Sequence, residues 1–115
     1  MPVQAGLALT LNNLSNRWAG AGRDEEALAA IEEAVDLHGA AIDASLDDVA
    51  SCLSNLAVRL GSLHRWNVAE TALAESTKIR LKLNLTNPGV NEADLAQSRA
   101  IAAWLEDRRA ARGTY

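Results

Sequence analysis

The chain has 115 residues, a formal net charge of −4 and a hydrophobic fraction of 49%. This length suits one domain, and the hydrophobic fraction is too high for a disordered chain. The acidic balance argues against general nucleic-acid binding, which needs a basic face, and the single cysteine, Cys52, rules out an internal disulfide. There is no apolar run near the ~20 residues of a membrane span and no signal-peptide pattern, so we expect a cytoplasmic protein without a membrane partner.

The first two predicted helices are separated by a glycine-rich turn. The first is expected over about residues 2–21, with Pro2 in its first turn, and "GAG" at 20–22 ends it. The second starts near Asp24, whose carboxylate can cap free N–H groups, and runs to about Ala44. Both show apolar residues at helical spacing.

Three more helices are predicted from the remaining turn signals. Ser45 is a candidate N-cap for the third helix, and a short turn at 61–65 leads into the fourth. "TNPG" at 86–89 is the strongest break in the chain, after which Asn91 caps a fifth helix that Gly113 ends.

The predicted core is built mainly from aliphatic residues, because aromatics make up only 3% of the chain. No segment alternates apolar and polar residues as a half-buried strand would, so the fold class is expected to be all-α. The residues predicted to face this core are Leu7, Leu11, Leu14, Trp18, Ala27, Leu28, Ile31, Ala34, Val35, Val49, Leu53, Leu56, Leu60, Ala69, Ala72, Leu73, Ile79, Leu83, Leu95, Ala102 and Leu105.

The chain contains an internal repeat. Residues 11–35 align with residues 53–77, and a repeat at a fixed period of this size indicates a helical solenoid in which neighbouring helix pairs share a core. The identical pairs are Leu11/Leu53, Asn13/Asn55, Leu14/Leu56, Arg17/Arg59, Arg23/Arg65, Ala27/Ala69, Ala30/Ala72 and Glu33/Glu75. Small residues at Ser15 and Ala27, and again at Ala57 and Ala69, are expected where the two helices of each pair cross closely.

The segment "LNNLSNRWAGAGRDEEALAAIEEAV" at 11–35 resembles a tetratricopeptide repeat. In particular, it is similar to the longer kinesin-light-chain-like variety common in multi-repeat bacterial proteins. The second copy departs from the family pattern at Leu60, where a ring is usual, and at His64, where a turn glycine is expected. The resemblance covers about residues 7–85.

This resemblance implies a short right-handed α-α superhelix of two helix hairpins plus a C-terminal capping helix. Repeat one would cover about 3–44 and repeat two about 45–86, with the capping helix over about 91–112. The capping helix is expected to be more polar than the helices of the repeats, since one of its faces covers the last apolar face and the other is exposed to solvent.

Residues of the first and third predicted helices, all of them polar except Val58, form the candidate site. They lie opposite the apolar stripe, and in the resembled family these helices line a concave surface where an asparagine often binds the backbone of a peptide. The candidate peptide-binding residues are Asn12, Asn13, Asn16, Ser54, Asn55 and Val58. The resemblance thus implies a non-catalytic module whose partner is a protein or peptide. In the other interpretation these amides are solvated or bond a neighbouring helix.

Self-association and enzyme activity are the two other functions to compare with peptide binding. Self-association, as a homodimer or as part of a longer repeat protein with a regulatory or structural role, is the alternative, because Val3, Leu7 and Leu9 would leave an apolar end uncovered. An enzyme is not expected: His38 and His64 lack further ligands at metal-binding spacing, and no phosphate loop is present. We therefore expect no catalytic residue, no metal and no cofactor.

Overall fold

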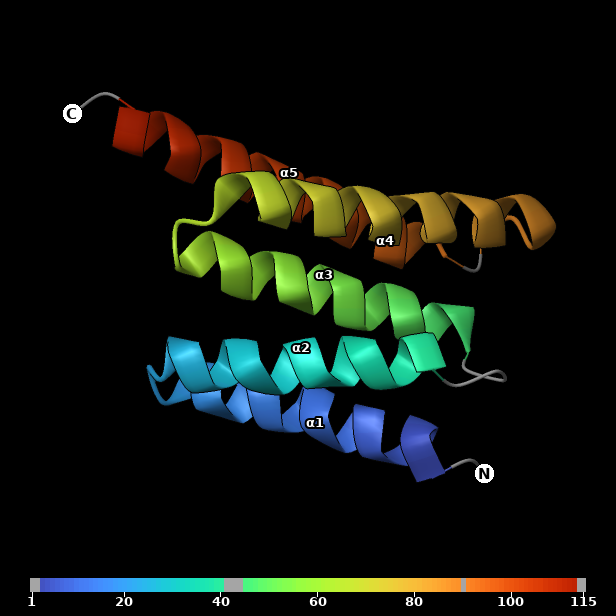
Figure 1. The fold of residues 1–115 in the computed structure, drawn as a ribbon. Helices are drawn as coiled ribbons and strands as arrows, with labels where there is room; N and C mark the ends of the chain where they lie inside the picture. Colours follow the sequence, from blue (N-terminus) through green and yellow to red (C-terminus); the bar gives the residue numbers. More distant parts are fainter. Residues whose placement is uncertain (1–2, 41–44, 90, 114–115) are drawn as a thin grey trace.

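A computed structural model describes residues 3–40, 45–89 and 91–113 of the chain. In this part of the chain all regular structure is helical, which confirms the all-α prediction. The helices stack in chain order as antiparallel neighbours in a slab of 48 × 32 × 20 Å, as a short solenoid does (Figure 1). The helices are α1 (Val3–Gly20), α2 (Asp24–Ala40), α3 (Leu46–Ser62), α4 (Trp66–Thr86) and α5 (Glu92–Gly113).

The helix ends lie close to the predicted ones. Asp24 begins α2, and Asn91 directly precedes α5, as predicted. Ser45 stands at the N-cap position of α3 in an extended conformation, but its side chain makes no capping hydrogen bond. The prediction that the second helix continues to Ala44 falls on residues 41–44, which lie outside the described part of the chain.

The turns that close the two hairpins have the same geometry. Gly22 and His64 stand at equivalent places of the repeat, and both have a left-handed backbone, with φ of 77° and 62°. In each turn the next residue, Arg23 or Arg65, donates its N–H five residues back, to the carbonyl of Trp18 or Leu60, at 2.8 and 2.9 Å. This is the Schellman pattern that usually takes glycine. His64 therefore adopts the conformation of the missing glycine.

The helices of each hairpin cross at small residues, as predicted. Ser15 and Ala27 are fully buried, and the Ser15 hydroxyl donates to the Ala27 carbonyl at 2.6 Å. In the second hairpin Ala57 and Ala69 are fully buried in the same cluster. A larger side chain at either crossing would push the helices apart.

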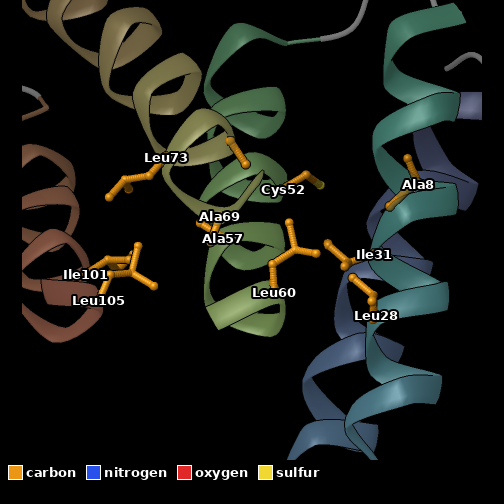
Figure 2. Packing of buried hydrophobic residues seen from close by; sticks show 12 residues of the cluster. Ala8, Leu28, Ile31, Cys52, Ala57, Leu60, Ala69, Leu73, Ile101 and Leu105 are labelled. Atoms are coloured by element: carbon orange, nitrogen blue, oxygen red, sulfur yellow. The ribbon is translucent and has the colours of Figure 1, made fainter. Parts of the chain in front are cut away.

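One apolar core runs across the stack. Figure 2 shows Leu60 of α3 beside Ile31 and Leu28 of α2, and Leu73 of α4 across from α5. Fully burying a leucine or isoleucine side chain stabilises a fold by roughly 1.5–3 kcal/mol, so the hairpins support one another through this shared interior. The buried members are Ala8, Leu28, Ile31, Ala34, Cys52, Ala57, Leu60, Ala69, Ala72, Leu73, Ile101 and Leu105.

Three residues predicted to face the core are exposed instead. Leu7 and Leu14 lie on α1, where no described helix covers the outer flank of the stack. Ala102 is also exposed, because α5 buries Leu95, Ile101 and Leu105 and turns Ala102 toward an open groove beside α4. The sequence therefore predicted Leu95 and Leu105 of the buried face of α5 correctly, but it placed Ala102 where the structure has Ile101.

A polar groove between the first helices of the repeats

A polar groove of about 400 Å³ lies between α1, α3 and α5. These are the helices that come first in each repeat and in the following segment, and they share one side of the stack. The lining residues are Asn12, Asn16, Ser51, Ser54, Asn55, Val58, Arg59, Asp94, Gln97 and Ile101. All of the predicted site residues except Asn13 are among them.

The Asn55 amide joins two walls of this groove. Its Nδ2 donates to the side-chain oxygen of Asn12 at 2.8 Å and to that of Asn16 at 2.9 Å. A side-chain amide has two N–H donors, so both donors of Asn55 are used inside the protein. The interpretation that an asparagine bonds a neighbouring helix therefore describes Asn55, which ties α3 to α1.

Asn13 occupies on α1 the place that Asn55 has on α3, but its surroundings differ. It is exposed and lies outside the groove lining. Asn55 reaches back to the helix of the preceding repeat, whereas no described helix precedes α1. The sequence identity of the two residues therefore does not give them the same contacts.

The Ser54 hydroxyl points into the core, toward α4, and not into the groove. Ser54 is buried, and its Oγ lies 2.6 Å from the Oγ of Ser76 on α4. Because Ser76 donates its own proton to the Ala50 carbonyl at 2.7 Å, Ser54 must be the donor of this pair. Ser54 thus shapes the groove wall and ties α3 to α4.

Arg80 fixes the third wall of the groove. Its side chain is buried, at 1% exposure, and its guanidinium reaches from α4 to α5. It donates to the Asp94 carbonyl at 3.1 Å, to the Ser98 hydroxyl at 2.8 Å and to the Gln97 side-chain oxygen at 3.0 Å. Burial lowers the pKa of Arg80, while the charges of Asp94 and Asp47 oppose that shift. The contact holds Asp94 and Gln97 at the groove.

Charged side chains of both signs line the groove or lie near it. Arg59 on α3 is half-buried, and burial lowers the pKa of its guanidinium, although the carboxylate of Asp24 acts in the other direction. The pKa of Asp47 is raised, first by burial and then by the negative charge of Asp94. Sequence reasoning missed Arg59, Asp94 and Gln97 as site residues. The recurrence of Arg17 as Arg59 was the one signal that pointed to any of them.

A family model described as tetratricopeptide repeat matches residues 7–42 and 49–85, which is more than half of the chain. The chain belongs to the tetratricopeptide repeat family. The match confirms the predicted resemblance over residues 7–85 at the level of the family, and the kinesin-light-chain-like variety stays a prediction. The first repeat contains α1 and α2, and the second contains α3 and α4. No curated protein and no solved structure matches the chain.

Cys52 and His38 are buried outside the groove. Burial raises the pKa of the Cys52 thiol to about 11, so it stays protonated and unreactive at neutral pH. His38 is buried at 3% exposure, and neither ring nitrogen has a hydrogen-bond partner among the described residues. Within residues 3–40, 45–89 and 91–113, no three potential metal-ligating side chains gather.

The described helices are also unsuited to crossing a bilayer. None of them combines the length and the apolar character that such a span needs.

Proposed function

We propose that the protein is a non-catalytic scaffold that binds an extended peptide segment of a partner protein in the groove between α1, α3 and α5. Membership of the tetratricopeptide repeat family supports a role in protein interaction. The observation that carries the proposal is the gathering of Asn12, Asn16, Asp94 and Gln97 around one groove on the side shared by the first helices.

The hydrogen bonds inside the groove leave groups of both kinds for a ligand. Asn12 and Asn16 accept from Asn55 through their oxygens, so the N–H groups of their amides remain to donate to peptide carbonyls. On the opposite wall the Asp94 carboxylate can accept from peptide N–H groups. The Gln97 oxygen already accepts from Arg80, and its amide N–H groups can donate to peptide carbonyls. An extended peptide alternates carbonyls and N–H groups, and this lining complements both.

A random peptide library displayed on phage supplies the probe for the test. The selected peptide is labelled, and its affinity is measured by fluorescence anisotropy for the wild type and for variants. Asn12→Ala combined with Asn16→Ala should weaken binding about tenfold or more, since each hydrogen bond contributes roughly 0.5–1.5 kcal/mol. Asn13→Ala is the matched control and should bind like the wild type. An equal loss of affinity in the double variant and in Asn13→Ala would contradict binding in the groove. A library that yields no binding peptide would also contradict it.

Self-association is a second candidate, and the exposed Leu7 and Leu14 on α1 favour it. Apolar side chains at the end of a solenoid are often covered by another subunit or repeat. Light scattering over a concentration series tests the idea. A dimer that Leu7→Ser/Leu14→Ser converts to a monomer would support it, whereas a wild type that stays monomeric at high concentration would remove it.

A further inference from the structure

A second, apolar groove of about 800 Å³ runs along α4 beside α5. Leu73, Thr77, Leu81 and Leu85 follow one another along α4 at helical spacing and form its floor. Leu81 is 50% exposed and Leu85 is 83% exposed, and none of the described helices covers them. Water-exposed leucines in a continuous stripe mark a surface that another element can bury.

The length of this groove suits a helix of about four turns. One repeat earlier, the equivalent place beside α2 and α3 is lined by Val35 and Leu60, the counterparts of Thr77 and Ala102. There α4 adds a wall that includes Val68 and Ala72, and the groove that remains is about 540 Å³. No described helix adds such a wall beside α4 and α5, where the groove is about 800 Å³. The lining residues of α4 run from Glu70 to Leu85, about 22 Å or four helical turns.

The charges at the groove select the kind of helix. Lys78 and Lys82 flank the apolar stripe, and neither makes an ion pair within the part of the chain that the structure describes. At the other end, Glu70 is already paired with Arg109 of α5, and Glu106 of α5 also lines the groove. An occupant therefore needs carboxylates on the side of its apolar stripe that faces Lys78 and Lys82.

A second copy of this chain does not supply them. The exposed leucines of α1 are the apolar end that a second copy would offer, and residues 3–20 contain no acidic residue. The acidic helix α2 buries Leu28 and Ile31 in its own core. We propose that the groove between α4 and α5 binds an acidic amphipathic helix of another protein, which covers the exposed leucines of α4.

The probe for the experiment is a labelled peptide with the sequence of residues 24–38, N-acetylated and C-amidated. It is acidic and amphipathic, and it comes from a helix that packs against a repeat of this kind. Fluorescence anisotropy should show binding to the full wild-type protein. Leu81→Ser/Leu85→Ser and Lys78→Glu/Lys82→Glu should each weaken binding at least tenfold. All four side chains are exposed, so circular dichroism should show that both variants remain folded.

Two matched controls separate this groove from other surfaces. Leu7→Ser/Leu14→Ser removes two exposed leucines at the opposite end of the stack and should leave binding unchanged. Asn12→Ala/Asn16→Ala tests the polar groove and should likewise have no effect, so this proposal and the proposed function fail or hold separately. A version of the peptide with lysine in place of its glutamates should bind at least tenfold more weakly.

Four outcomes would overturn the proposal. They are no binding of the acidic peptide, equal binding to Leu81→Ser/Leu85→Ser, equal binding of the lysine-substituted peptide, and a wild-type dimer that Leu81→Ser/Leu85→Ser dissociates. The second would mean that the peptide docks elsewhere or replaces α2 in the core. The last would make a second copy the occupant.

Discussion

Replacing Gly61 by alanine tests how closely α5 packs on α3. In an open helix this change stabilises by about 1 kcal/mol, because alanine is the better helix former. At Gly61 the new Cβ would lie 2.5 Å from a methyl carbon of Leu105 and 2.8 Å from the ring of Trp104. Leu105 is buried and cannot swing into water, so α5 must shift. Overpacking costs roughly 1–3 kcal/mol, and contacts this short belong in the upper part of that range. After the gain of about 1 kcal/mol from alanine, we expect a net loss of about 1–2 kcal/mol.

Thermal and urea unfolding followed by circular dichroism measure this loss. The melting temperature should fall by about 4–8 °C for a chain of this size. Gly6→Ala is the control, since a Cβ at Gly6 meets no atom within 4 Å, and it should raise the melting temperature. If Gly61→Ala melts at or above the wild-type temperature, α5 does not pack against α3 as described.

Three further changes test the turns and the buried polar groups. His64→Gly should stabilise by about 0.5–1 kcal/mol in urea unfolding, because it relieves the left-handed backbone that Gly22 adopts freely, and an unchanged or lower midpoint would contradict this. Arg80→Ala should cost about 2–4 kcal/mol and loosen α5, seen as faster amide exchange in residues 92–113 than elsewhere; uniform exchange would argue against it. Cys52 has a folded-state pKa raised from 9.0 to about 11, so the unfolded chain loses its thiol proton first and stability should fall between these values as pH rises. Cys52→Ala should lack this part of the pH dependence, and identical profiles for the two proteins would refute the shift.

Much of the fold could be predicted from local signals in the sequence. Turn residues and apolar spacing placed the helices, and the recurrence of small residues placed the hairpin crossings at Ser15 and Ala27. These features depend on a few neighbouring residues, so they can be read before any tertiary contact is known. The repeat then supplied the stacking, because equivalent helices bury equivalent faces.

The contacts of the site could not be predicted in the same way. Asn13 and Asn55 are both asparagines at equivalent places, yet among the described helices only Asn55 has a preceding one to bond. The exposure of Ala102 and the reach of Arg80 into α5 likewise depend on how α5 docks, which departs from the repeat. A period in the sequence predicts which face of a helix is covered, but the partner of each polar group is set by the neighbouring element.

The α2–α3 and α4–α5 interfaces of this stack contain different residues at equivalent places of the repeat. His38 stands on α2 where Arg80 stands on α4. Between α4 and α5 the guanidinium of Arg80 bonds three acceptors and leaves only its Nε without a partner in the described chain, whereas on α2 the imidazole of His38 lies buried with neither nitrogen bonded there. Buried polar groups without partners weaken the interface that contains them. Under mechanical load we therefore expect the α2–α3 interface to separate first. The hairpin of α1 and α2 would then leave as a unit, while α3, α4 and α5 stay packed together.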